Sequence, residues 1–226
     1  MVTASSSSSS PQEVTVSGRI EVSRGSGNQK TDLSNVVVWL TPADSHAQAT
    51  IKRHVQLLQS RKTFSPHVLV VPVGSPVEFP NQDPFFHNVF SLFEGKRFDL
   101  GLYEAGSTRT IVFDRPGISY LFCNIHPEMS AVIIALKTPY YGMSDSNGTF
   151  SIPNVPTGTY ELRVWDERVL PDALDALTRR VAISDTSPFV GVIHVTEQRN
   201  LSATHKNKYG QDYDTPSSNS PIYSRP

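Results

Sequence analysis

Apolar and polar residues alternate in short runs along most of the chain, which is the period-two pattern of half-buried β-strands. In the clearest run, Val14, Val16, Ile20 and Val22 recur at even spacing around Gly18. With 17 Pro and 13 Gly in 226 residues, turns are frequent, and the pattern predicts an all-β protein. Similar runs predict further strands at 36–40, 118–123, 149–152, 160–165, 180–183 and 189–195, and a short helix is predicted at 171–177.

Asp145, Asn147 and Gly148 form a candidate turn between two of these extended segments. Asn-Gly pairs favour the positive-φ conformation of tight hairpins. The same residue types also suggest calcium, but an EF-hand loop needs more oxygen ligands and a closing Glu, which does not follow at that spacing. We therefore interpret the segment as a hairpin turn.

The two ends of the chain are polar. Residues 1–12, with a serine run at 5–10, are interpreted as a linker, and residues 197–226 as a mobile tail in which only 205–210 could pack locally. No stretch is long enough to span a bilayer, and the start lacks the charged and apolar regions of a secretory signal. A serine spacer of this kind would suit a leader or lipid anchor outside this sequence, which would tether the protein.

The net charge of the chain argues against two classes of binding partner. The chain carries 20 Lys and Arg against 21 Asp and Glu, a formal net charge of −1. Since no bulk basic field is present, neither nucleic acid nor an anionic membrane surface is an expected partner.

The strongest chemical signal surrounds the single cysteine of the chain. Cys123 opens a loop in which His126 and Met129 follow at three-residue intervals, and Pro127 restricts the backbone between them. A further candidate ligand, His87, lies upstream. Taken singly, a cysteine is most often a small buried hydrophobe and a histidine a structural hydrogen-bonding group. The combination of thiolate, two imidazoles and a thioether is instead the ligand set of a mononuclear type 1 copper site.

Other metal sites fit these residues poorly. Structural zinc takes four Cys, His or carboxylate ligands and has no use for a thioether. A c-type haem needs Cys-x-x-Cys-His, and a thiolate-bridged dinuclear copper centre needs two cysteines. The chain also lacks the His-x-His pairs that hold a trinuclear copper cluster. A single copper ion is the remaining interpretation.

At residues 64–137 the sequence resembles the cupredoxins, with the Cys-x-x-His-x-x-Met spacing of the amicyanin and plastocyanin-like group. The resemblance implies a Greek-key β-sandwich in which His87, Cys123 and His126 are equatorial copper ligands and Met129 is the axial one. It further implies that Asn88 ties the two ligand-bearing segments together. Besides the ligand loop, the residues that carry the resemblance are Phe64, Pro66, 68–73, Gly74, Val77, Phe79, Asn81 and Asp83.

A second resemblance covers 144–167, where Asp-Ser-Asn-Gly-Thr-Phe is followed by Pro-Thr-Gly-Thr-Tyr. This segment resembles the transthyretin-like carboxypeptidase regulatory module. We predict a sandwich of that kind from 13–43 and 138–196, with the copper domain at 44–137 inserted in it. The alternative is two domains joined end to end, with the first strands belonging to the copper domain. Pairing of 14–22 with strands after 150 would favour insertion.

The cupredoxin resemblance implies one-electron transfer between redox proteins, not enzymatic catalysis, in the periplasm or another extracytoplasmic compartment. The chain is similar to the cupredoxins of methylamine-utilisation type, but nothing in it identifies the redox partner. Phe85, Phe86 and Pro127 are candidates for the docking patch. Two alternatives stay open, namely a copper-handling protein and an adhesive or structural module with a secondary copper site.

Overall fold

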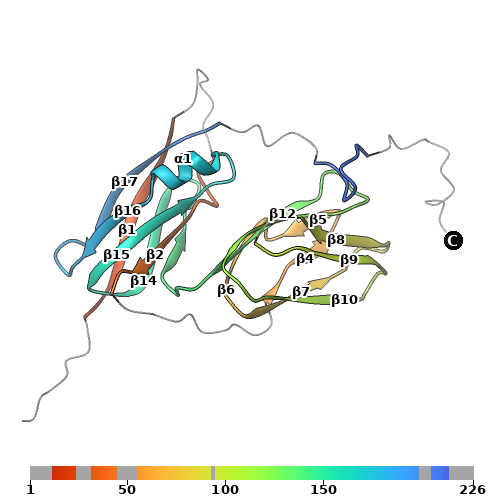
Figure 1. Ribbon diagram of the computed structural model, residues 1–226, viewed down its shortest axis with the longest axis horizontal. Helices are drawn as coiled ribbons and strands as arrows, with labels where there is room; N and C mark the ends of the chain where they lie inside the picture. The colour runs from red at the N-terminus through yellow and green to blue at the C-terminus, as the bar shows by residue number, and fades with distance from the viewer. Residues whose placement is uncertain (1–11, 24–31, 45–54, 93–94, 199–204, 214–226) are drawn as a thin grey trace, which may run out of the picture. The chain divides into compact units, whose positions relative to one another are not determined.

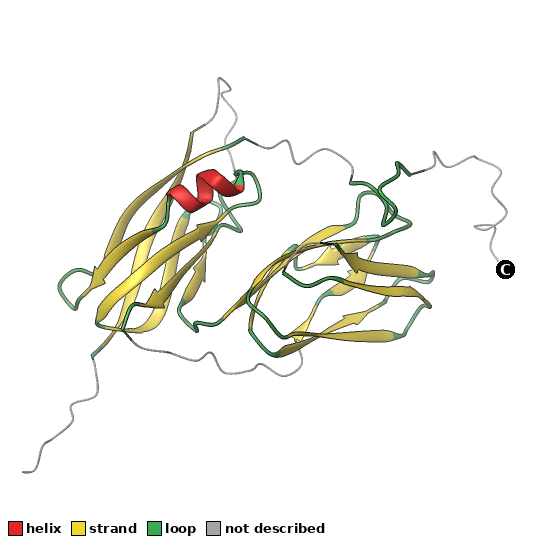
Figure 2. Cartoon of the chain, in the orientation of Figure 1, coloured by secondary structure: helices red, strands yellow, loops and turns green. Residues whose placement is uncertain are grey.

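The computed structural model of the chain describes residues 12–23, 32–44, 55–92, 95–198 and 205–213 (Figure 1). Within these ranges the chain is almost entirely β-structure, with one short helix (Figure 2), as the alternating pattern predicted. None of the described residues belongs to a helix long and apolar enough to cross a membrane. The chain divides into two compact units, 1–49 with 137–202 and 50–136 with 203–226.

The first unit contains two sheets that share a hydrophobic core. Ile20, Phe150 and Leu162 belong to this core and come from three different strands. One sheet has the order β14 (Thr149–Pro156), β1 (Glu13–Ser23), β17 (Phe189–Thr196); the other has the order β13 (Tyr141–Met143), β2 (Val37–Pro42), β15 (Gly158–Trp165), β16 (Arg179–Ile183). The predicted helix is present as α1 (Pro171–Ala176), with Pro171 in its first turn, where a missing N–H costs nothing.

Strand β1 connects the two sequence segments of this unit. It pairs antiparallel with β14, where Gly18 lies opposite Phe150, and parallel with β17, where Ile20 lies opposite Ile193. The strand at 13–23 therefore pairs with strands after residue 148 and not with 64–79. Along the chain, residues 50–136 of the second unit lie between the two segments of the first, and residues 203–226 of the second unit follow them. The transthyretin-like identity of the first sandwich stays a prediction.

The predicted turn at Asn147 and Gly148 is present, but it does not close a hairpin. The strands on either side of it belong to different sheets, because β13 pairs with β2 whereas β14 pairs with β1. Gly148 has a φ of +82°, and a Cβ there would lie 2.4 Å from the carbonyl oxygen of Ile20. The Asp145 carboxylate accepts backbone hydrogen bonds from Asn147 and Thr149, so the acidic side chain stabilises the turn.

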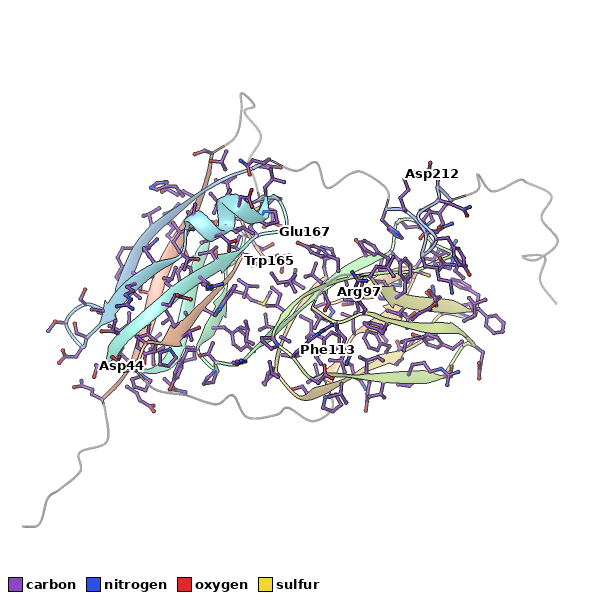
Figure 3. All side chains as sticks on the ribbon, in the orientation of Figure 1. Asp44, Arg97, Phe113, Trp165, Glu167 and Asp212 are labelled. Carbon is purple, nitrogen blue, oxygen red and sulfur yellow. The ribbon has the colours of Figure 1, made fainter. Side chains whose placement is uncertain are left out.

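The second unit is also a sandwich, and Phe113 is one of the side chains that fill its core (Figure 3). Its sheets combine strands far apart in sequence, as the predicted β-sandwich requires. The larger sheet has the order β6 (Val68–Pro72), β12 (Ser130–Leu136), β11 (Gly117–Phe122), β8 (His87–Ser91), β9 (Phe98–Tyr103). The smaller has the order β10 (Thr108–Phe113), β7 (Ser75–Pro80), β3 (Val55–Gln56), and β4 (Leu58–Ser60) forms a hairpin with β5 (Thr63–Ser65).

Residues 205–213 lie in the segment predicted to be a mobile tail, and 205–210 is the part of it that was expected to be able to pack locally. These residues, among them Asp212 (Figure 3), belong to the second unit, and Lys208 and Tyr213 make hydrogen bonds to it. A local turn satisfies their backbone, since the Asn207 side chain accepts hydrogen bonds from the N–H groups of Tyr209 and Gln211. Of the predicted linker and tail, residues 12, 197 and 198 are also described, whereas 1–11, 199–204 and 214–226 lie outside the described residues.

Candidate metal centre

The candidate ligands gather at one end of the inner strands of the five-stranded sheet. His87 is the first residue of β8, and Cys123 directly follows the last residue of β11. These two strands are antiparallel, with Phe90 opposite Phe122, so the start of one lies beside the end of the other. Two residues 36 positions apart in sequence are thereby brought into contact.

The loop from Cys123 to Met129 is closed by its own backbone. The Cys123 N–H donates to the Met129 carbonyl at 3.2 Å, and the Met129 N–H donates to the His126 carbonyl at 3.1 Å. On either side of the loop, Phe122 and Ser130 pair in the ladder between β11 and β12. The loop ends are therefore fixed by the sheet, which limits the positions that the side chains of Cys123 and His126 can take.

Three potential metal donors converge in this site. The Sγ atom of Cys123 lies 3.7 Å from His87 Nδ1 and 3.5 Å from His126 Nδ1. All three donor atoms lie within 4.8 Å of one another, and all three side chains are buried. His87, Cys123 and His126, which the sequence singled out, are thus brought together.

These separations fit a shared metal ion. Bonds from a divalent zinc-sized ion to imidazole nitrogen and thiolate sulfur are about 2.0–2.3 Å long. Three such ligands arranged in a plane around one ion are separated from one another by roughly 3.5–4.0 Å. The two sulfur–nitrogen distances, 3.7 and 3.5 Å, lie at these values. A metal ion could therefore bind with little rearrangement of the ligands.

Met129 lies at the end of the same loop. Its side chain is 1% exposed and belongs to the same hydrophobic cluster as Cys123. A thioether in this position matches the weak axial donor expected from the sequence. Its role as a fourth ligand stays a prediction.

The thiol of Cys123 is buried but faces hydrogen-bond donors. Burial raises its pKa, and the backbone N–H groups of Asn88, Ile125 and His126 partly offset this by favouring the thiolate. A metal ion would replace the proton, because the thiolate is the form that binds metals.

The His126 imidazole is also prepared for ligation. Burial, followed by the nearby charges of His87 and Lys62, lowers the pKa of His126 to about 4. The neutral ring with a free nitrogen lone pair is therefore the form present near pH 7. Phe85 packs against both imidazoles, with ring centroids 5.2 Å from His87 and 5.5 Å from His126.

Asp83 is a site residue whose role was missed from the sequence. Its Oδ2 atom lies 2.8 Å from His87 Nε2, so the ring donates there and leaves Nδ1 to face Cys123. A metal-binding histidine commonly donates its second N–H to a carboxylate in this way. The four-residue spacing of Asp83 and His87 was the available signal, but residue types alone do not reveal the turn that holds the carboxylate.

A turn 21 residues upstream holds that carboxylate in place. Arg61 and Lys62, both at a φ of 55°, donate their backbone N–H groups to Asp83 at 2.6 and 2.9 Å. Burial raises the pKa of Asp83, but hydrogen bonds from Lys62, His87 and Arg61 outweigh burial and lower it. Asp83 is therefore a carboxylate near pH 7.

Asn88 contributes to the site through its backbone. Its side-chain Nδ2 donates to Asp99 of β9 at 2.7 Å, whereas its backbone N–H faces the Cys123 sulfur. The Asn88 side chain thus connects to β9, and the link between the ligand segments that was predicted for it stays a prediction.

The predicted docking residues differ in exposure. Phe86 is 55% exposed, whereas Phe85 and Pro127 are partly buried. Phe85 contacts the two imidazoles, so only Phe86 offers a largely free aromatic face.

Comparison with known proteins gave matches only among solved structures. No protein-family model matches the chain, and no curated protein matches it. A Cu-containing nitrite reductase from Thermus scotoductus SA-01 is similar at 28% identity and a TM-score of 0.36, over 42% of this chain and 25% of that chain. A purple cupredoxin from Nitrosopumilus maritimus is similar at 24% identity and a TM-score of 0.33, over 36% of this chain and 99% of that one.

Amicyanin gives a further match. A mutant of amicyanin in the Cu(I) form is similar at 14% identity and a TM-score of 0.35, over 44% of this chain and 98% of that chain. Each of these similarities covers less than half of the present chain. These three solved structures are a Cu-containing nitrite reductase, a purple cupredoxin and amicyanin.

Proposed function

We propose that the protein holds one type 1 copper ion and carries single electrons between redox proteins. His87, Cys123 and His126 are the equatorial ligands in this proposal, and Met129 is the axial one. The observation that carries it is the buried convergence of one thiol and two imidazole nitrogens within 4.8 Å. When bound, a copper ion supplies one-electron chemistry by alternating between the Cu(I) and Cu(II) states.

The donor set favours copper over zinc. A structural zinc site would need a fourth strong ligand, and the described residues add no further His, Cys, Asp or Glu to this cluster. A thiolate and two imidazoles with a weak thioether are the set typical of electron-transfer copper.

The surrounding residues favour electron transfer by keeping the ligands in place. Backbone hydrogen bonds close the ligand loop, and Asp83 fixes the orientation of His87. Ligands that are held in this way move little when the charge of the site changes, so the structural cost of electron transfer stays small. We therefore propose that the protein is not an enzyme.

The partner is proposed to be a redox protein that contacts the edge near His126, with Phe86 as the exposed aromatic of the docking patch. We propose that such a carrier works in the periplasm or another extracytoplasmic compartment, which the family resemblance supports, and that a leader outside this sequence would tether it. Transient redox complexes bury little surface, which a small patch satisfies.

Redox titration tests the proposal. The copper-loaded protein should lose its visible absorption on reduction and regain it fully on reoxidation, cycle after cycle, with one electron per protein. Met129→Leu should keep the absorption and raise the reduction potential, because loss of a sulfur donor disfavours Cu(II). An unchanged potential in Met129→Leu would remove Met129 from the ligand set, and irreversible bleaching of the unaltered protein would refute the carrier function.

A further inference from the structure

Residues 205–213, which we call the C-terminal segment, lie against the ligand loop. The Tyr213 hydroxyl donates to the Cys123 carbonyl oxygen at 2.6 Å, and the Lys208 N–H donates to Asn124 Oδ1 at 2.9 Å. The His205 ring packs on Phe122, with centroids 4.3 Å apart. Three consecutive residues of the ligand strand and loop, 122–124, are thus contacted by a segment more than 80 positions downstream.

The hydrogen bond from Tyr213 engages the second backbone group of Cys123. Its N–H is already bound to the Met129 carbonyl, and its carbonyl accepts the Tyr213 hydroxyl. With both backbone groups bound, the direction of the Cα–Cβ bond is set, and with it the region in which the sulfur lies. Tyr213 therefore acts on the position of the thiol without contacting it.

Tyr213 is itself held by the C-terminal segment. Its hydroxyl oxygen lies 3.1 Å from His205 Nδ1, and the two rings meet edge to face at 5.2 Å. His205 Nδ1 also lies 2.9 Å from the Lys206 carbonyl oxygen, which can only accept, so Nδ1 carries the proton and shares it between that carbonyl and the Tyr213 hydroxyl, while the hydroxyl donates to Cys123. Hydrogen bonds in such a chain strengthen one another.

A second connection reaches the strand that carries His87. Lys208 Nζ lies 2.7 Å from Asp99 Oδ2, and Asp99 Oδ1 accepts a hydrogen bond from the Asn88 side chain at 2.7 Å. The side chains of Lys208 and Asp99 are 24% and 38% exposed, so this ion pair contributes little by itself. The hydrogen bond from Tyr213 to Cys123 is partly buried and reaches the ligand residue itself, so the proposal rests on it.

We propose that the C-terminal segment is part of the metal centre and that Tyr213 is a positioning residue for Cys123. The segment fixes the ligand loop in the metal-free protein, and so prepares the site for the ion. The effect on bound copper rests on the proposed function, whereas the effect on the metal-free loop does not.

The variant Tyr213→Phe tests whether Tyr213 fixes the ligand loop in the metal-free protein. This variant keeps the ring and removes the hydroxyl, so amide hydrogen exchange at Cys123 and Met129 should become roughly two- to tenfold faster, as expected for loss of one hydrogen bond. The amide of Ile20, which donates to the Gly148 carbonyl in the first unit, should keep its rate. Equal rates at Cys123 and Met129 in variant and unaltered protein would overturn the proposal.

Tyr160→Phe is the matched control. The Tyr160 hydroxyl donates to the Pro156 carbonyl at 2.7 Å in the first unit, so the variant loses the same kind of bond away from the metal centre. It should speed exchange in the first unit and leave Cys123 and Met129 unchanged. Faster exchange at Cys123 in both variants would mean general destabilisation and would also overturn the proposal.

The rate at which a chelator removes copper tests the positioning role of Tyr213 in the copper-loaded protein. Tyr213→Phe should release copper roughly two- to tenfold faster than the unaltered protein, with a displaced thiolate-to-copper band, and Tyr160→Phe should do neither. Lys208→Met should show a smaller effect. If the unaltered protein forms no coloured copper complex, the proposed function fails while the exchange result still decides the role of Tyr213. If the unaltered protein forms a coloured copper complex and Tyr213→Phe has the same release rate and absorption band, only the positioning role of Tyr213 fails.

Discussion

Replacement of Cys123 by serine is expected to abolish the thiolate-to-copper absorption completely. A hydroxyl is neither soft nor ionised near pH 7, so the site loses the donor that selects copper. The copper-dependent gain in stability should disappear as well. For the unaltered protein that gain is about 2.7 kcal/mol when free copper is a hundredfold above Kd. Both are measured by absorption spectroscopy and by thermal unfolding with and without Cu(II).

Ala131→Ser is the control for this substitution. Ala131 is 1% exposed and lies in the same hydrophobic cluster as Cys123. A serine there adds a buried hydroxyl, with a cost of about 1–3 kcal/mol, but leaves every proposed ligand intact. This variant should lose stability and keep its colour. Retention of the absorption band by Cys123→Ser would show that the colour does not come from the thiolate.

Asp83→Asn is expected to have the second largest effect. The Asp83 carboxylate accepts hydrogen bonds from Arg61, Lys62 and His87. An amide places an NH₂ group against at least one of these donors and leaves it unpaired, which costs about 1–3 kcal/mol of stability. Since the partner that orients His87 is weakened, copper affinity should fall about 10- to 100-fold. Competition with a chelator and chemical unfolding measure the two effects.

Asp114→Asn makes the same change on the surface. The Asp114 side chain is 61% exposed and pairs with Lys96 at 2.9 Å. Pairs of this kind contribute about 0–1 kcal/mol, so stability and copper affinity should stay close to those of the unaltered protein. Equal copper affinity in Asp83→Asn and Asp114→Asn would exclude a role for Asp83 in the metal centre.

The ligand loop was the part of the site most accessible from the sequence. Cys123, His126 and Met129 are close in the chain, so their spacing alone indicated a common site. His87 depended on the family resemblance, and the structure places its Nδ1 atom 3.7 Å from the sulfur. Asp83 was missed as an orienting residue because its role depends on the backbone of Arg61 and Lys62, which composition cannot reveal.

The fold, like the site, could be predicted where it depends on neighbouring residues, but not where it depends on residues far apart in sequence. Alternation predicted the strand at 14–22, in which Val16 and Ile20 are fully buried. It did not show that the segments flanking Gly148 join different sheets, because strand partners are chosen by the rest of the fold. Polarity predicted a mobile tail, but Tyr213 finds an acceptor in the Cys123 carbonyl. A hydrogen bond to a backbone carbonyl cannot be predicted from the types of residue in the sequence.

In our proposal a single copper ion binds Cys123, His87 and His126 in a type 1 site. Electron paramagnetic resonance of the protein loaded with one equivalent of Cu(II), recorded with the visible spectrum, tests it most directly. We predict a narrow parallel hyperfine splitting and intense thiolate-to-copper absorption, because spin density is shared with the Cys123 sulfur. A wide parallel splitting with a pale spectrum would contradict a type 1 site.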